Sequence, residues 1–293
     1  MAPRTPERPV LLCIVGDSRC GSTLLQHLLA SQPGVVALGE VRRLERFVAE
    51  DRACGCGATV GECQWWCNLL SRAGFADRKP ATLPPPQRWR QWLGDGLLLF
   101  AWRLGRPDWA LPWLRRRAEV ADDVASLALA AAGNAGLVVD SSKDPGHFLT
   151  LTLQRRVAVQ PVLLLRDGRA VVWSQIRRTG IDEGRAIRHW RRVMRALAIL
   201  RHGGSPAPIV LRYEDVCRAP RAALSQLLGM AGLSLDEPAM PDLHAIGGSP
   251  DFRSTPLDEL QVDDRWKDQM PAATLARFER RAGALNRRIG AAA

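Results

Sequence analysis

Long apolar runs are missing from this sequence. No stretch reaches the roughly 20 consecutive apolar residues that cross a bilayer. The amino-terminal arm, MAPRTPERP, is too short and too polar for a signal peptide. Internal repeats are missing as well. These absences argue against a membrane span and a repeat protein, and we expect a soluble, cytoplasmic chain.

Recognisable nucleic-acid-binding modules are also missing, although the chain carries 41 Lys+Arg against 30 Asp+Glu and a formal net charge of +11. The arginines are scattered and do not alternate regularly with aromatic residues, so we expect no nucleic-acid partner. The positive excess suits either a cleft for a multiply charged anion or a generally basic surface. With 293 residues, 46% of them hydrophobic, the chain can form one large domain, which we predict to span residues 1–293.

The lysine of the Walker A motif is missing from a segment that otherwise fits the motif. Residues 10–29, VLLCIVGDSRCGSTLLQHLL, predict an apolar strand, a glycine loop and a helix, which together bind phosphate on backbone N–H groups. Gly16, Gly21 and Thr23 stand at motif positions, but Ser22 replaces the lysine and Arg19 supplies a cation within the loop. Because the Walker lysine reaches the β- and γ-phosphates, its loss disfavours an ATPase or kinase. The loop indicates a nucleotide with a different transferable group.

Two other predicted strands end in cations. In VLLLRDGRAVVWS, residues 162–174, Arg166 follows the strand and Ser174 lies on the next helix. In LVVDSSKDPGHF, residues 137–148, the strand delivers Lys143. Because ligands bind at the carboxyl ends of parallel strands, we expect these residues to meet the first loop at one sheet edge.

The chain alternates between strand and helix patterns. This alternation predicts an α/β fold with a P-loop-like central parallel sheet flanked by helices on both faces. The expected strands are 10–15, 35–38, 137–140, 159–165 and 208–213. The expected helices are 22–32, 41–51, 146–156, 168–178, 183–202, 219–232 and 271–289.

These motifs resemble the PAPS-dependent sulfotransferases, in particular bacterial members and the tyrosylprotein sulfotransferases. The resemblance implies transfer of a sulfonate from 3′-phosphoadenosine 5′-phosphosulfate (PAPS) to a hydroxyl or amine. It also implies that the first loop binds the 5′-phosphosulfate, and that Arg166 and Ser174 bind the 3′-phosphate. The loop residues are Asp17, Ser18, Arg19, Cys20, Gly21, Ser22 and Thr23.

The resemblance covers nearly the whole chain. It places Tyr213, in LRYED, near the nucleotide, and Arg253, at the end of GGSPDFR (Gly247 to Arg253), in a late phosphate-contacting segment. The sequence departs from the family pattern at Cys20, where serine is commoner, and at Ser249, where asparagine is more usual. Neither change removes a backbone donor.

The resemblance also implies a catalytic set. Glu40 follows the second predicted strand and would act as the base, while Arg19 and Lys143 would offset charge in the transition state. These cations would replace the magnesium of phosphoryl transfer, so we expect no metal requirement in catalysis. Glu40 could instead be an acid that complements a helix dipole. His147 is the alternative base.

Tryptophan is concentrated in an expected helical insert, residues 52–118. Seven of the ten tryptophans lie there: Trp65, Trp66, Trp89, Trp92, Trp102, Trp109 and Trp113. Indoles bind apolar and sugar surfaces, so the insert could form an acceptor-binding lid, or its tryptophans could pack it against the sheet. A small molecule, a glycolipid or a peptide could be the acceptor. The sequence pattern leaves the acceptor and the oligomeric state open.

Four of the seven cysteines fall within the same insert, at Cys54, Cys56, Cys63 and Cys67. Four thiolates this close could bind a structural zinc ion, although the spacing is not that of a standard zinc ribbon. Reduced thiols or a disulfide are the other interpretations.

Two other functions are weighed against the sulfotransferase. One is a P-loop small-molecule kinase, which the absence of the Walker lysine disfavours. The other is a nucleotide-binding module without catalysis, which the presence of Glu40, Arg19 and Lys143 disfavours.

Overall fold

The protein is built on a five-stranded sheet with the order β2-β3-β1-β4-β5, in which every paired strand is parallel. The computed structural model describes residues 9–76, 88–104, 115–133, 135–237, 244–248 and 259–291, with backbone alone for 88–94 and 290–291. The strands are β1 (Val10–Gly16), β2 (Val35–Gly39), β3 (Leu137–Lys143), β4 (Ala158–Leu165) and β5 (Ile209–Arg212). The expected α/β fold with a parallel sheet is confirmed.

Both faces of the sheet are buried, and the pleat of β1 explains how. Leu11, Cys13 and Val15 belong to one core cluster, while Leu12 and Ile14 belong to the other. Successive side chains of a strand point to opposite faces, so a strand covered on both sides is a continuous apolar run. The run LLCIV in β1 has this character.

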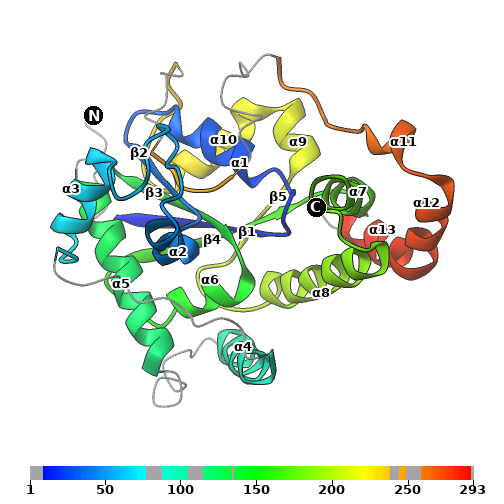
Figure 1. Cartoon of the computed structure of the whole chain (residues 1–293), viewed down its shortest axis with the longest axis horizontal. Helices are drawn as coiled ribbons and strands as arrows, with labels where there is room; N and C mark the ends of the chain where they lie inside the picture. Colours follow the sequence, from blue (N-terminus) through cyan, green and yellow to red (C-terminus); the bar gives the residue numbers. More distant parts are fainter. Residues whose placement is uncertain are drawn as a thin grey trace.

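Helices cover the two faces (Figure 1). One face carries α1 (Ser22–Ala30), α9 (Tyr213–Arg218) and α10 (Pro220–Gly229). The other carries α4 (Arg88–Arg103), α5 (Arg115–Ala132), α6 (Pro145–Leu151), α7 (Gly168–Thr179) and α8 (Glu183–Arg201). The short elements that follow β2 are the 3₁₀ turn η1 (Val41–Arg43), α2 (Leu44–Ala49) and α3 (Gln64–Arg72). The chain ends with α11 (Trp266–Gln269), α12 (Ala272–Phe278), the π-helical turn η5 (Glu279–Gly283) and α13 (Ala284–Ala291).

Helix boundaries differ from the expected ones in three places. The helix expected at 41–51 begins with a 3₁₀ turn, and the helix expected at 146–156 ends at Leu151. A separate helix, α9, begins directly after β5, and α10 begins at Pro220. Proline is favoured in the first turn of a helix and breaks a helix interior, so Pro220 divides the two.

The carboxyl-terminal helices pack closely on the start of α7. A Cβ added to Gly168 would lie 2.5 Å from the Trp190 ring and 2.7 Å from Phe278, so only glycine fits there. The rings of Trp190 and Phe278 also contact each other, with centroids 5.4 Å apart. Among the described residues, no helix is both long and apolar enough to cross a membrane.

Candidate functional site

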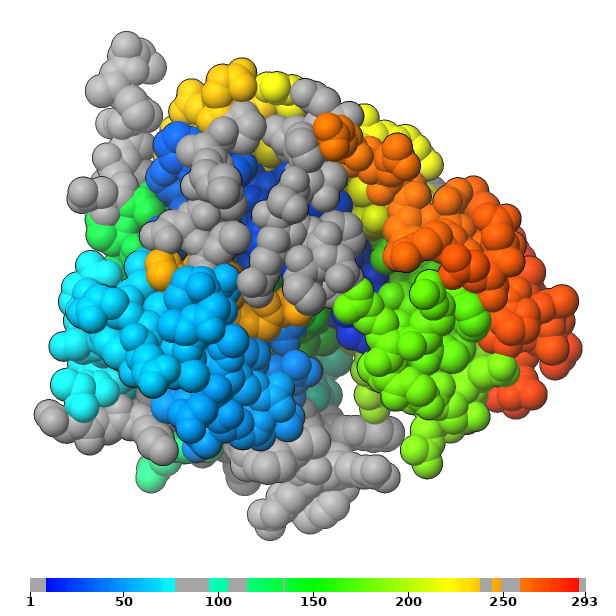
Figure 2. Space-filling model, turned by 45° about the horizontal axis from the view of Figure 1, so that its top comes forward, coloured from blue at the N-terminus to red at the C-terminus, as the bar shows by residue number. Residues whose placement is uncertain are grey.

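The carboxyl ends of the central strands bring the predicted site together. In the sheet register, Lys143 at the end of β3 pairs with Val15 of β1, and Gly16 pairs with Leu164 of β4. Glu40 follows β2 directly, beside β3. The first loop, the Glu40 position and the Lys143 position therefore share one edge, as the strand pattern predicts. Figure 2 shows a hollow in the surface between residues 40–76, in light blue to cyan, and α7, in green.

Glu40 is paired with cations through both of its carboxylate oxygens. Oε1 lies 2.5 Å from Lys143 Nζ, and Oε2 lies 3.1 Å from Arg43 Nη1. Glu40 is buried, with 7% of its surface exposed, whereas Arg43 is exposed. Although Glu40 is the N-cap residue of η1, its side chain makes no capping hydrogen bond. The Glu40 carboxylate is therefore held by two cations and not by a side-chain cap of the turn.

A distant segment, residues 244–248, supports Glu40 from behind. Ile246 forms a parallel bridge with Gly39, and the Glu40 N–H donates to the Ile246 carbonyl at 2.8 Å. Gly247, with φ 77°, lies against the Glu40 side chain so closely that an added Cβ would be 2.9 Å from Cδ. A larger residue at 247 would therefore displace the carboxylate.

The first loop is a tight phosphate-sized turn. Arg19 and Gly21 have φ of 72° and 96°, and α1 begins immediately afterwards at Ser22, without a side-chain cap. An added Cβ on Gly21 would meet the Tyr213 ring at 2.3 Å, so the tyrosine requires glycine at this position. Loop N–H groups and an uncapped helix N-terminus are suited to holding an anion.

Cys20 is a packing residue of that loop. It is 1% exposed, and its Sγ fills the space in which a Gly16 side chain would stand. Burial raises the pKa of the Cys20 thiol to about 11, with nearby Lys143 and Arg166 acting in the opposite direction. Both cations lie beside the loop, since Arg166 donates to the Arg19 carbonyl and Lys143 pairs in register with Val15.

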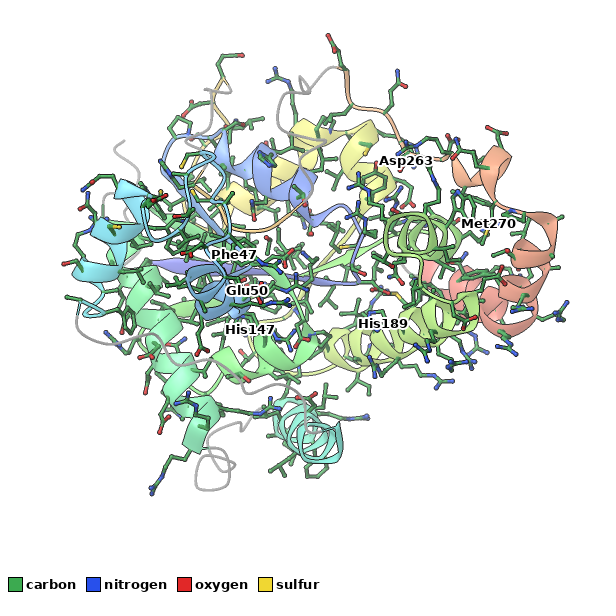
Figure 3. The ribbon with its side chains drawn as sticks, in the orientation of Figure 1. Phe47, Glu50, His147, His189, Asp263 and Met270 are labelled. Atoms are coloured by element: carbon green, nitrogen blue, oxygen red, sulfur yellow. The ribbon has the colours of Figure 1, made fainter. Side chains whose placement is uncertain are left out.

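Asp17 and Ser18 face α7 and α8. The Asp17 carboxylate, 1% exposed, accepts from Gln175 Nε2 at 3.0 Å and lies 3.1 Å from His189 Nε2. Gln175 also donates to Ser18 Oγ at 2.9 Å. Figure 3 labels His189 on α8. The Asp17 side chain therefore fastens the loop to the two helices, leaving its backbone as the part that can face a ligand.

Arg19 of the first loop is hydrogen-bonded to Ser174 of α7. Arg19 Nε donates to Ser174 Oγ at 3.3 Å across 155 positions of sequence. The pKa of Arg19 is lowered, first by burial and then by the positive charges of Arg178 and Arg166. An anion bound among these three arginines would relieve that repulsion.

Arg166 is committed to the protein itself. Its guanidinium donates to the Arg19 carbonyl and to the Asp263 carbonyl, both at 2.8 Å, and lies 3.2 Å from the Asp263 carboxylate. It also stacks over the Tyr213 ring at 4.2 Å, and the Tyr213 hydroxyl accepts from the Asp263 N–H at 3.2 Å. Tyr213, 1% exposed, thus lies beneath the loop as a support. Figure 3 shows Asp263 beside α7.

The alternative base, His147, lies in the core. It is 2% exposed, and its Nε2 lies 2.8 Å from the Asp140 carboxylate. In Figure 3 it lies with α6, one of the helices on the face that also carries α5 and α8. Glu40 instead follows the end of β2, at the edge that carries the first loop.

The described tryptophans of the insert pack inward. Trp66 is fully buried, Trp102 is 2% exposed and contacts the Phe148 ring edge-on at 5.1 Å, and Trp65 is partly buried against the core. For these three, packing is the observed role. The side chains of the other four tryptophans of the insert lie outside the described part of the structure; these are Trp89, Trp92, Trp109 and Trp113. Ser249 and Arg253 also lie outside the described residues.

A small cavity is also present, at the other end of the sheet. It measures about 120 Å³ and is lined by Trp102, Val159 and Pro206, among others. Val159 begins β4, whereas Arg166 follows its end, so this cavity does not belong to the charged edge.

Three residues of the site were not predicted from sequence. Arg178 stands one helical turn after Ser174 on α7, and that i,i+4 spacing was a usable signal. His189 contacts Asp17 of the loop and Asp263 contacts Arg166, each from a segment without a local motif. Only the tertiary structure brings them to these positions.

Comparison with known proteins identifies the family. A sequence model of the sulfotransferase family matches residues 11–237, and the chain belongs to that family. The fold resembles the sulfotransferase domain from the Synechococcus PCC 7002 olefin synthase (22% identity, TM-score 0.54, covering 94% of this chain and 97% of that one). Weaker similarity links it to the sulfotransferase domain from the curacin biosynthetic pathway (17%, TM-score 0.48, covering 93% and 97%). A sulfotransferase from Alicyclobacillus acidocaldarius is more distant (15%, TM-score 0.40, covering 93% and 95%). No curated protein sequence matches the chain.

Proposed function

We propose that the protein is a PAPS-dependent sulfotransferase that uses Glu40 as its general base. Membership of the family supports sulfonate transfer as the reaction, in preference to the phosphoryl transfer of a kinase. The observation that carries the finer assignment is the pairing of Glu40 with Lys143 beside a phosphate loop whose Walker lysine is Ser22. A carboxylate that can accept the proton and a cation for the sulfonate thus lie together.

The loop residues 17–23 would hold the 5′-phosphosulfate of the donor. In support, the loop ends at an uncapped helix N-terminus and contains the cation Arg19. PAPS supplies a sulfonate on a good leaving group, the bisphosphate. Arginine and lysine can offset the charge of that group without a metal, so we assign none to catalysis.

Ser174 and Arg166 would recognise the 3′-phosphate, with Arg19 and Arg178 beside them. Burial, and then repulsion from Arg178 and Arg166, lower the pKa of Arg19, and the positive charges gathered there support an anion at this position. Arg166 already holds the Asp263 carboxylate, so we assign it a second role, fixing the loop carbonyl of Arg19. Arg253 stays in the proposal as a phosphate contact.

Glu40 would take the acceptor proton as the acceptor oxygen attacks sulfur and the bond to the bridging phosphate oxygen breaks. Lys143 has three N–H donors and uses one on Glu40, which leaves others for the transferring group. A single lysine would thereby orient the base and stabilise developing negative charge.

The acceptor would enter at the insert, which borders the hollow seen in Figure 2. We propose residues 52–118 as the acceptor-binding part of a single domain, and a small molecule, glycolipid or peptide as the acceptor. Because Trp66 and Trp102 pack inward, we propose that other parts of the insert recognise the acceptor.

The test is a screen with sulfur-labelled PAPS. Purified protein is incubated with alcohols, phenols, sugars, glycolipids and tyrosine peptides, and products are identified by the mass of an added sulfonate. Labelled product that requires Glu40 supports the proposal. Labelled phosphate transfer from ATP with strict magnesium dependence would contradict it.

A further inference from the structure

The insert and a distant segment meet in a cluster of metal-ligating side chains. The Sγ atoms of three cysteines and the Nδ1 atom of one histidine all lie within 4.8 Å of one another. This Cys₃His cluster consists of Cys54, Cys56, Cys63 and His244. His244 replaces Cys67 of the set considered from sequence, since Cys67 is exposed and donates to the Gly61 carbonyl. None of the seven cysteines forms a disulfide.

The spacing of the cluster matches tetrahedral zinc. The three Sγ–Sγ distances are 3.3, 3.5 and 3.7 Å, and His244 Nδ1 lies 3.3 Å from Cys63 Sγ and 3.7 Å from Cys54 Sγ. Zn–S bonds of about 2.3 Å and Zn–N bonds of about 2.0–2.1 Å at tetrahedral angles put sulfurs about 3.8 Å apart, and sulfur and nitrogen about 3.6 Å apart. A disulfide would instead require an S–S distance of about 2.05 Å. We propose that the Cys₃His cluster binds one structural zinc ion.

The loop that carries the cysteines is folded as a turn around the cluster. Ala53 and Thr59 form an antiparallel bridge, the Cys54 N–H donates to the Ala58 carbonyl at 2.8 Å, and Gly57 takes a φ of 97°. The Cys56 N–H donates to Cys54 Sγ at 3.5 Å. Cys56 is exposed, and this gives the ion an entry path.

The histidine is held in the orientation that a ligand needs. Trp65 stacks on the His244 ring, with centroids 5.2 Å apart and planes within 6°. Trp66 Nε1 donates to the His244 carbonyl at 2.7 Å. Such outer contacts fix a ligand's position before the metal binds. They also give the two tryptophans a specific role.

The zinc would connect the insert to the wall of the active site. His244 begins the segment 244–248, in which Ile246 bridges Gly39 and Gly247 lies against Glu40. The same segment reaches the first loop, since an added Cβ on Gly248 would lie 3.0 Å from Thr23 Oγ1. The ion touches no reacting group in this arrangement, so its role is structural. The assignment stands independently of the proposed donor and base.

Metal content of the purified protein is the first test. Protein made in zinc-supplemented medium and purified without chelators is measured by elemental analysis, and a chelator-stripped, reduced sample is titrated with zinc. We expect one zinc per chain, thiol protons released on binding, and a lower Tm after stripping, because binding energy contributes to folding. Replacement with Co²⁺ should give the visible spectrum of a tetrahedral thiolate site.

Matched variants identify the ligands. The Cys56→Ser and His244→Gln variants should lose zinc, whereas Cys67→Ser should keep it. The His244→Cys variant should bind zinc again, unlike His244→Gln, because four cysteines then form the ligand set. Cys56 is exposed, so its substitution is the one least expected to disturb packing. A circular dichroism spectrum verifies the fold of each variant.

Three results would overturn the proposal. The first is reduced, folded wild-type protein that takes up no zinc in the titration. The second is loss of zinc in Cys67→Ser together with retention in His244→Gln, which would assign the four-cysteine set. The third is a disulfide between cluster cysteines in protein purified with zinc present, detected as an intact mass two hydrogens below that of the reduced chain and located by peptide mapping.

Discussion

The two ends of the charged sheet edge differ in how their charges are balanced. At the β2–β3 end, Glu40 pairs with Lys143 at 2.5 Å, and Arg42 pairs with Asp144 at 3.1 Å. At the β1–β4 end, burial and then the neighbouring charges of Arg178 and Arg166 lower the pKa of Arg19. A carboxylate held between cations suits proton transfer, whereas arginines that repel one another suit an anionic ligand. In the proposed function the first is the chemical end of the edge and the second is the binding end.

Both ends hold a cation on strained backbone. Lys143 and Arg19 have φ of 67° and 72°, a region that costs non-glycine residues of order 1–3 kcal/mol. Asp51 is the other non-glycine residue with positive φ in the described part of the chain. The strain falls on two of the residues that carry the proposed chemistry.

Removing the base should have the largest effect. Glu40→Gln keeps the shape of the side chain but cannot accept a proton, so we expect kcat to fall by about 10²–10⁴-fold while bisphosphate affinity barely changes. Steady-state kinetics and calorimetry measure the two. Glu50→Gln, at an exposed acid on the same side of the sheet, is the control. Near-normal turnover of Glu40→Gln with a weakly acidic acceptor would remove Glu40 from the role and make His147 the next residue to test.

Removing the loop cation should affect both ends. Arg19→Ala loses a charged contact to the donor in the ground state and in the transition state. We expect bisphosphate affinity to fall about 10- to 100-fold, with a fall in kcat as well. Arg177→Ala, on α7 and exposed, is the matched control. An Arg19 variant with unchanged affinity would show that the binding end does not include this residue.

The 3′-phosphate assignment predicts a smaller and selective effect. Ser174→Ala should weaken 3′,5′-bisphosphate binding by about 2- to 10-fold, the value of one hydrogen bond, and leave 5′-monophosphate binding unchanged. Calorimetry with both nucleotides measures this. If wild-type protein binds the two nucleotides equally, PAPS is not the donor.

The smallest effect concerns the acid that balances Arg166. The pKa of Asp263 is lowered from 3.8 to about 2. The hydrogen bond from Arg265 is the largest cause of this decrease, and the charge of Arg166 contributes less. A lowered pKa means that the stabilisation is complete above about pH 4 and is lost as the pH falls toward 2. Asp263→Asn should therefore lower the Tm by about 1–3 °C at neutral pH, since the group is partly exposed. Thermal melts should show this difference shrinking below pH 4. A difference that stays constant to pH 2 would contradict the carboxylate's part in stability.

Much of this molecule follows from local sequence pattern. The run LLCIV predicts a strand buried on both faces, and the loop GDSRCGST predicts a phosphate turn before a helix. Because parallel strands end at a common edge, Glu40 and Lys143 could be placed together before any contact was known. The helix ends were less predictable, as the end of α6 at Leu151 illustrates, since boundaries depend on capping and packing.

The tertiary structure alone decided which distant residues complete each end. His189 contacts Asp17 of the first loop, and Asp263 contacts Arg166 beside it. His244 contacts Cys54 across 190 positions of sequence. No periodicity or spacing encodes such a contact, because it depends on how whole segments pack. The sequence by itself determined the strands, the phosphate loop and the charged edge. Packing decided that Arg166 pairs with Asp263 and that segment 244–248 supports Glu40. It also decided that His244, and not Cys67, lies beside the three cysteines.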